Sequence, residues 1–480
     1  MTDLSLIIPE ISLLTLVCGV LLIDVFRGRS PVSIVFWAAV ISILVTLVLV
    51  SLQFPDRTMI AFFGTVKIDP MGAVLKAVAL ALVLMSFFFA RDHFDKKQEE
   101  CSEFYILSLF ATIGMLVLIS ANSLLTVYLG LELLSLSLYS MVAMNRDSAQ
   151  SSEAAMKYFI LGALASGMLL YGISMLYGVS GTLQLDQLVA NRELIDQERI
   201  LVVFGVVFVI VGIAFKLGVV PFHMWLPDVY QGAATPVTLF IGTAPKIAAF
   251  AMAIRVLANG LQGLAVEWSS MLIILAVLSI GLGNIVAIAQ SNMKRMLAYS
   301  TIAHMGFLLL GVLAANKSGY ASAMFYVIIY ALTTTGTFGA VILLSRTDTD
   351  ADQISDFSGL AKRSPWFGFI MLVLMFSLAG VPPFAGFWAK WYVLKEVVAA
   401  GYVWLAALAV LFSIIGAYYY LRIVKLMYFD ESNDEQRLVA SQDMKLVLSV
   451  NGLVIFLLGL LPGTLMSICA IATATILYSS

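Results

Sequence analysis

The chain has 480 residues, of which 61% are hydrophobic and only 12% are charged. Soluble domains carry about 25% charged residues, so this composition excludes a water-soluble enzyme and indicates an integral membrane protein. The net charge of −2 argues against a basic surface for nucleic acid, and three widely separated cysteines are too few to hold an iron–sulfur or zinc cluster.

Apolar windows predict an all-α integral membrane fold with about 14 transmembrane helices, since about 20 apolar residues cross the hydrocarbon core. The expected spans are 4–26, 32–54, 70–90, 103–121, 123–144, 153–178, 200–220, 237–257, 270–290, 295–315, 319–345, 366–395, 403–428 and 443–462. The apolar segment 464–478 follows Pro462 and is shorter, so we expect a tail at the membrane surface.

The loops on the two sides of these spans differ in lysine and arginine content. The side without the termini holds roughly twice as many of these residues, with Arg255 counted among the loop residues of the terminus side. Cytoplasmic loops are the ones enriched in lysine and arginine. Both termini are therefore expected on the periplasmic side of a bacterial inner membrane.

In the interiors of the predicted spans, away from their ends, the basic residues are lysines and not arginines: Lys76, Lys157, Lys216, Lys246 and Lys390. A charge at mid-membrane costs roughly 2.5–3.5 kcal/mol on insertion scales. Lys76 and Lys157 lie about a turn or two inside their spans, where an ammonium group can reach the headgroups. The other three lie deeper. We predict that they relay protons, because a desolvated lysine exchanges its proton and arginine does not.

Glu132 lies in the middle of the span 123–144. A buried carboxyl group is protonated or paired, and an intramembrane lysine is the expected partner. A purely structural ion pair is the alternative. Glu10 lies about two turns from the N-terminus, and neither Glu10 nor Lys76 is assigned a role.

Two spans are predicted to be broken helices. The stretch after Val220 reads PFHMWLPDVYQG, and the span 366–395 contains GVPPFAGF. Proline interrupts a helix, and discontinuous helices mark ion sites in transporters. Lys216 and Lys390 lie beside these two breaks, and Pro245 predicts a third irregularity beside Lys246.

Similar residues recur at the same spacing in the two proline-containing strings. Residues 155–164 also match residues 323–332. The matched spans lie five apart, so we expect an inverted five-helix repeat of spans 4–8 and 9–13. Chance similarity of apolar segments is the alternative. The expected units are an N-terminal three-helix segment 1–100, a first repeat 101–260, a second repeat 268–430, and a C-terminal helix and tail 431–480.

Two histidines are candidate relays, because imidazole titrates near neutral pH. His223 lies beside the first break, and His304 lies within the span 295–315. A histidine that only packs between helices is the alternative for His304.

Four strings carry a resemblance to a known family: FKLGVVPFHMWLPDVYQGAATPV, GLELLSLSLY, NMKRMLAYSTIAHMGF and GVPPFAGFWAKWYVL. They resemble the antiporter-like membrane subunits of respiratory complex I, most closely over 120–310 and 375–395. The DVYQGA string and the length are most similar to the subunit N branch, the bacterial counterpart of mitochondrial subunit 2. Subunit L is longer, and subunit M typically carries glutamate at the place of Lys390.

The resemblance implies a non-redox, proton-translocating subunit of NADH:quinone oxidoreductase, a translocase. It implies a proton relay formed by Glu132, Lys216, Lys246 and Lys390. Lys157 matches a further lysine of the family pattern and joins His223 and His304 as a secondary candidate. No cofactor is expected in this chain, because NADH, FMN, iron–sulfur clusters and quinone would belong to partner subunits. The expected partners are neighbouring antiporter-like and small membrane subunits of complex I, together with lipid.

Two other functions fit the same pattern. A subunit of a multi-subunit sodium/proton antiporter would use the same lysines and breaks without any electron transfer. A purely structural membrane scaffold with inert lysines is the third possibility.

Overall fold

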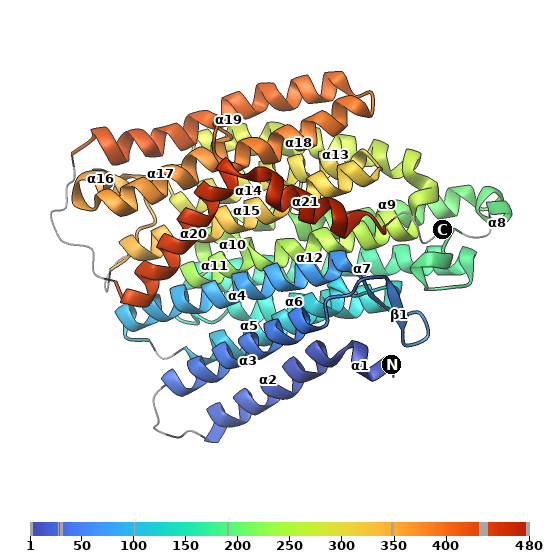
Figure 1. Ribbon diagram of the computed structural model, residues 1–480, viewed down its shortest axis with the longest axis horizontal. Coiled ribbons are helices and arrows are strands. Elements are labelled where there is room, and N and C mark those ends of the chain that lie inside the picture. Colours follow the sequence, from blue (N-terminus) through green and yellow to red (C-terminus); the bar gives the residue numbers. More distant parts are fainter. Residues whose placement is uncertain are drawn as a thin grey trace.

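The computed structural model describes residues 3–26, 28, 32–99, 101–189, 192–346, 350–431 and 440–476. This part of the chain is a bundle of helices (Figure 1). Its one strand pairing is the antiparallel pair β1 (Met59–Ala61) and β2 (Val66–Ile68). The all-α membrane fold predicted from the sequence is confirmed.

Thirteen helical segments of the described chain are long and apolar enough to cross a bilayer. They are α2 (Ile8–Phe26), α3 (Ser33–Leu52), α4 (Pro70–Lys97), α5 (Ser102–Ile119), α6 (Leu124–Val142), α7 (Ala149–Ser180), α9 (Arg199–Leu217), the run Thr235–Gly260, the run Gln262–Ile288, α14 (Met293–Leu313), α15 (Lys317–Leu344), α19 (Val403–Phe429) and α20 (Gln442–Leu460). Each coincides with one predicted span.

The fourteenth predicted span, 366–395, is two helices. α17 (Pro365–Ala379) and α18 (Ala385–Ala399) have 15 residues each, which is too short for either to cross a bilayer alone. Two consecutive prolines between them prevent a continuous helix. The break predicted here is confirmed.

Short elements complete or join the spans. The run Thr235–Gly260 consists of α11 (Thr235–Gly242), α12 (Ala244–Ala253) and the π-helix η2 (Ile254–Gly260), and the next run consists of η3 (Gln262–Leu264) and α13 (Ala265–Ile288). The others are α1 (Asp3–Leu6), η1 (Leu185–Gln187), α8 (Arg192–Gln197), α10 (Trp225–Gly232), η4 (Ile354–Phe357), α16 (Leu360–Arg363) and α21 (Pro462–Thr473).

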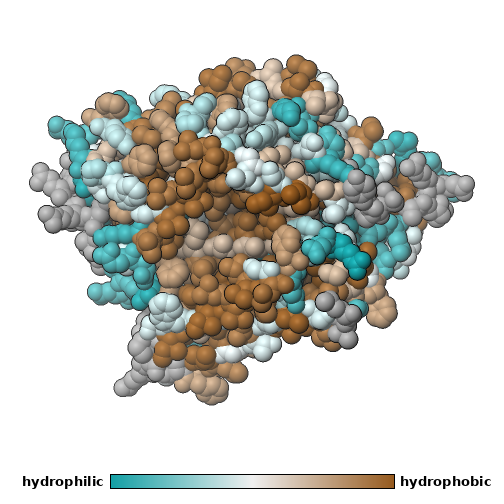
Figure 2. All heavy atoms as spheres, in the orientation of Figure 1, coloured by the Kyte–Doolittle hydropathy of each residue, from teal (hydrophilic) through white to brown (hydrophobic). Residues whose placement is uncertain are grey.

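The interior of the bundle is formed by helices that are buried on all sides. Every residue in the most apolar part of the run Thr235–Gly260 is buried, as are 94% in α14 and α15, against 28% in α2. A helix that is apolar all round is either buried in protein or exposed to lipid. Figure 2 shows apolar side chains covering much of the outer face in this view, so the peripheral helices have a surface suited to lipid.

The helices α5 and α6 approach closely because each carries a glycine at the contact. A Cβ atom on Gly114 would lie 2.6 Å from the backbone nitrogen of Leu134, and one on Gly130 would lie 2.8 Å from that of Leu118. Small residues allow such close packing in membranes. The contact fixes the position of α6, the helix that carries Glu132.

The C-terminal helix α21 packs against α4 and α15. The segment predicted as a surface tail therefore lies along the bundle. The helix α1 and the end of α21 lie toward the same end of the bundle (Figure 1), as an even number of membrane crossings requires.

Arg255 is not a loop residue, as the orientation count assumed. It lies in η2 and is 0% exposed. Its guanidinium group donates to both carboxylate oxygens of Asp69, at 2.5 and 2.7 Å, and to the carbonyl of Ile119 at 3.0 Å. A buried arginine is tolerated here because a carboxylate and a carbonyl together satisfy it.

We expect Arg255→Met to destabilise the protein by about 3–5 kcal/mol, because it leaves the Asp69 carboxylate buried and unpaired. Thermal unfolding of the detergent-solubilised protein measures the effect. Arg199→Met is the matched control, since Arg199 pairs with Glu267 at the surface with a side chain 63% exposed. That change should cost less than about 1 kcal/mol. Equal costs for the two variants would contradict the structural role of Arg255.

Candidate functional site

Two helices inside the bundle end in the same kind of turn. α9 ends at Leu217 and α17 ends at Ala379, and the glycines that follow, Gly218 and Gly380, have φ angles of +79° and +83°. A left-handed glycine is a common helix end. Both helices therefore stop directly before the proline-containing strings, as the sequence predicted.

The carbonyl groups at these two helix ends accept hydrogen bonds from lysine. Lys246 Nζ donates to the carbonyl of Leu217 at 2.9 Å and to that of Lys216 at 3.2 Å. Lys390 Nζ donates to the carbonyl of Ala379 at 2.9 Å. Leu217 and Ala379 occupy the same place relative to the following glycine. Because a helix C-terminus carries partial negative charge, each end favours an ammonium group without a carboxylate.

A third irregularity lies beside Lys246. Thr243 separates α11 from α12 with φ −122° and ψ −93°, directly before α12, whose first turn contains Pro245. This is the irregularity predicted from Pro245. The Lys246 side chain is almost fully buried, and its Nζ lies 5.4 Å from the centre of the Trp225 ring, an arrangement that adds cation–π attraction.

Lys216 faces α6 from the last turn of α9. Its Nζ donates to Ser135 Oγ at 2.7 Å, and the residue is 6% exposed. A small cavity between α6, α7 and α9 is lined by Lys216 together with Ser135, Tyr139 and Ser166. The ammonium group therefore borders a space with polar walls and is not enclosed only by apolar packing.

On α6, Glu132 lies one turn before Ser135, the residue that accepts the hydrogen bond of Lys216. Glu132 and Lys216 do not form a direct ion pair within the described structure, where Ser135 takes the hydrogen bond of Lys216 instead. Glu132 Oε1 is buried and has no hydrogen-bond partner among the described residues. Glu132 and Lys216 therefore lie in the same part of the bundle, but they do not form the ion pair that the sequence predicted.

Lys390 borders a second polar cavity. Its Nζ donates to Ser413 Oγ at 2.8 Å and lies 5.3 Å from the centre of the Phe307 ring. The cavity beside it is also lined by His304, Asn284 and Tyr420. Lys390 and His304, which the sequence placed on separate spans, therefore face the same space.

His304 is held at both ring nitrogens. Nδ1 lies 2.7 Å from the hydroxyl of Tyr326, and Nε2 lies 3.0 Å from that of Tyr420, which in turn lies 2.5 Å from Ser300 Oγ. A neutral imidazole has one donor and one acceptor nitrogen, so one tyrosine donates and the other accepts. His304 lines two cavities, the one beside Lys390 and a separate one that Thr333 also lines.

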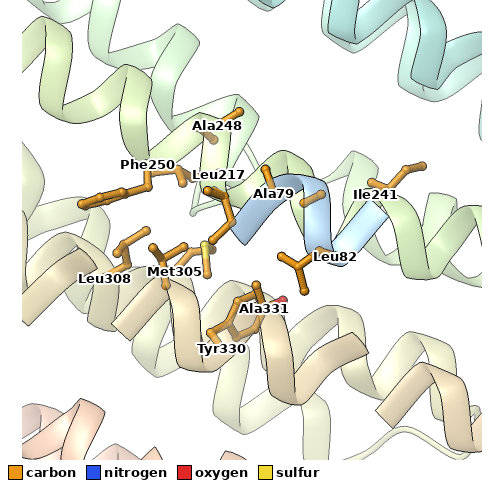
Figure 3. Packing of buried hydrophobic residues seen from close by; sticks show 14 of the residues in the cluster. Ala79, Leu82, Leu217, Ile241, Ala248, Phe250, Met305, Leu308, Tyr330 and Ala331 are labelled. Atoms are coloured by element: carbon orange, nitrogen blue, oxygen red, sulfur yellow. The ribbon is translucent and has the colours of Figure 1, made fainter. Parts of the chain in front are cut away.

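Apolar side chains separate these polar places. Figure 3 shows Leu217 of α9 and Phe250 of α12 close to Met305 and Leu308 of α14, the helix that carries His304. These four residues are almost fully buried. The polar groups therefore lie in separate small spaces and not in one open channel in this structure.

The two remaining candidates lie elsewhere. Lys157 has a side chain 44% exposed and pairs with Glu153 and Asp228, both at 2.7 Å. Asp228 also pairs with Arg295 at 2.8 Å, so Lys157 belongs to a charged network at the rim. His223 lies in the turn between α9 and α10, and its buried Nδ1 has no partner among the described residues.

Sequence reasoning missed the groups that hold these lysines and His304. Ser135, Ser413, Tyr326 and Tyr420 are ordinary residues of transmembrane helices. Ser135 stood in the string GLELLSLSLY and Tyr326 in the segment that matches residues 155–164, but neither was singled out. The described residues contain no group of three or more His, Cys, Asp or Glu side chains placed to hold a metal ion.

Residues 121–416 match the family model for the transmembrane part of NADH:quinone oxidoreductase and Mrp antiporter proteins. A NADH-quinone oxidoreductase subunit N from Thiobacillus denitrificans is 52% identical over 98% of this chain and 97% of the relative. The protein of the same name from Herminiimonas arsenicoxydans is 51% identical over the full length of both chains.

Solved structures match as well. A chain of respiratory complex I from Thermus thermophilus with bound aureothin has a TM-score of 0.84 at 32% identity, covering 97% of this chain and 100% of that one. A chain of the Mrp complex from Dietzia sp. has a TM-score of 0.86 at 20% identity, covering 99% and 98%, a likeness of fold alone. The chain belongs to the NADH-quinone oxidoreductase subunit N family, within the wider family of antiporter-like membrane subunits.

Proposed function

We propose that this chain is a proton-translocating membrane subunit of NADH:quinone oxidoreductase, where electron transfer from NADH to quinone drives proton export. One observation carries the proposal: the ammonium groups of the buried Lys246 and the half-buried Lys390 donate hydrogen bonds to the carbonyl ends of interrupted helices. The homologues at about half identity over the whole chain bear the name of that enzyme's subunit N. As part of it, the chain acts in a translocase.

The relay begins at Lys216 and ends at Lys390. Lys216 takes a proton from the cytoplasmic side through the cavity beside Ser135. Glu132 favours the charged form of Lys216, and a change in a neighbouring subunit that moves Glu132 releases the proton to Lys246. Lys390 receives it by way of His304 and releases it to the opposite side. A lysine serves each step because it can be neutral or charged, whereas arginine stays charged.

The chain itself transfers no electrons. NADH, FMN, the iron–sulfur clusters and quinone would be carried by partner subunits. Neighbouring antiporter-like and small membrane subunits would flank the chain in the bacterial inner membrane. The excess of basic residues in the loops opposite the termini favours periplasmic termini. The lysines would be divided between two inverted repeats, 101–260 and 268–430, after the N-terminal segment 1–100 and before the C-terminal part 431–480.

A subunit of a sodium/proton antiporter is the rival function. Its support is the similar fold of the Mrp chain at 20% identity, which is weaker than 52% identity to a subunit N. Purification of the native assembly separates the two functions. Co-isolation with NADH dehydrogenase activity is the expected result, and an assembly that exchanges sodium for protons without oxidising NADH would overturn the proposal.

Lys216→Ala and Lys390→Ala should each reduce proton pumping several-fold while the complex still assembles, because each removes a protonatable group. Pumping is measured by quenching of a pH-sensitive dye in proteoliposomes supplied with NADH and quinone. Lys395→Ala is the control, since Lys395 lies on the same helix as Lys390 with a side chain 66% exposed. Full pumping in both test variants would contradict the proposed relay.

Ser135→Ala should lower pumping less than Lys216→Ala does, because it removes only the hydrogen-bond acceptor of the buried ammonium. A lost buried partner costs about 1–3 kcal/mol. Ser137→Ala is the matched control: Ser137 lies on the same helix and bonds only to the carbonyl of Leu133. Indistinguishable pumping rates for the two serine variants would show that Ser135 does not position Lys216.

A further inference from the structure

Glu10 and Lys76, which the sequence left without a role, form an ion pair inside the bundle. Glu10 of α2 is 9% exposed and Lys76 of α4 is 6% exposed, and Lys76 Nζ donates directly to Glu10 Oε1. Ser120, which follows α5, donates to the same oxygen at 3.3 Å. The pair joins three helices of the N-terminal part of the chain, outside the residues that match the family model.

The second carboxylate oxygen of Glu10 is not satisfied. Oε2 is buried and has no hydrogen-bond partner among the described residues. A buried ion pair is favourable only where its remaining lone pairs are also bonded. The arrangement is therefore poor as a purely structural link, and it leaves an oxygen free to accept a proton or a water.

A cavity leads to this pair. Its lining includes Lys76 and Ser120 together with Lys67, Asp69 and Gln53, and it has room for a water molecule. Gln53 follows the last residue of α3, and Lys67 and Asp69 lie around the start of α4. The cavity thus connects the pair with the end of the bundle at which α2 and α4 begin.

Few other charges face the pair. Lys67 lies 3.8 Å from Asp186, and Asp69 is bound to Arg255. α3 carries no titratable residue, and on α5 Glu103 and Tyr105 lie near the opposite end, about 25 Å away at 1.5 Å per residue. The charges around the cavity are therefore balanced in sign.

The site is separate from the lysine series. Ala79 and Leu82 continue α4 beyond Lys76 into the apolar cluster around Leu217, whose carbonyl binds Lys246 (Figure 3). Both are 0% exposed. This apolar layer separates the Glu10–Lys76 site from Lys246. The cavity lined by Lys76 is then the polar route from the solvent to the Glu10–Lys76 pair.

We propose that Glu10 and Lys76 form a second proton-exchange site, open to the compartment that faces the terminus end of the bundle. The proton moves from Lys76 Nζ to Glu10 Oε1, where the N–H bond breaks and an O–H bond forms, leaving a neutral amine and a neutral carboxylic acid. Hydronium in the cavity then protonates the Lys76 amine and becomes water, so that the site has gained one proton and holds a neutral carboxylic acid beside an ammonium group. Loss of that proton from the ammonium group to water, followed by transfer from Glu10 back to Lys76, restores the original ion pair. The site does not depend on the pumping function proposed above.

Infrared difference spectroscopy of the intact complex in proteoliposomes tests this directly. Changing the pH of the compartment at the terminus end should change the C=O stretch of a protonated carboxylic acid. The change should be absent in Glu10→Gln and shifted in Glu10→Asp. It should also be absent in Lys76→Arg, because arginine keeps the ion pair but does not give up its proton. The readout is independent of pumping, so either proposal can fail alone.

Two results would overturn the proposal. One is a wild-type complex whose carboxyl spectrum matches that of assembled Glu10→Asp at every pH. The other is an unchanged carboxyl signal in Lys76→Arg, which would show that the two groups do not share the proton. Glu267→Gln is the control, since Glu267 pairs with Arg199, whose side chain is 63% exposed, and its loss should leave the signal intact.

Discussion

The architecture depends on one interaction, the hydrogen bond from a buried lysine ammonium to the free carbonyl groups at the end of an interrupted helix. Without a helix end, Lys246 and Lys390 would have only apolar neighbours and hydroxyl groups at membrane depth. Without the ammonium, the carbonyls beside Gly218 and Gly380 would lack a partner in a dry interior. The helix break and the lysine therefore satisfy each other's polar groups, and the loss of either one leaves the other without its hydrogen-bond partner.

Much of this could be read from the sequence because the bilayer imposes strong constraints. Thirteen spans follow from apolar length alone, and the split of the fourteenth follows from Pro382 and Pro383, since proline cannot continue a helix in lipid. The lysines stood out because charge is rare at that depth. Arg255 was misjudged by the same logic, because its partner Asp69 lies 186 residues away and only the fold shows that it is satisfied.

The polar partners of the site were not predictable for a similar reason. Ser135 and Tyr420 are common in membrane helices, and nothing in the order of residues says which lysine or histidine they will meet. The Glu10–Lys76 pair spans 66 residues and three helices. Such contacts are set by packing, and packing at Gly114 and Gly130 brings α5 and α6 together in a way that periodicity does not reveal.

The two tyrosines on His304 also bear on timing. With a hydroxyl on each ring nitrogen, a proton that crosses the imidazole leaves every hydrogen bond along the row pointing the opposite way. A second proton cannot follow by the same route until the tyrosine hydroxyls rotate and the imidazole returns to its first tautomer. In the proposed relay, this row would therefore pass one proton at a time and would have to reset its hydrogen bonds before the next.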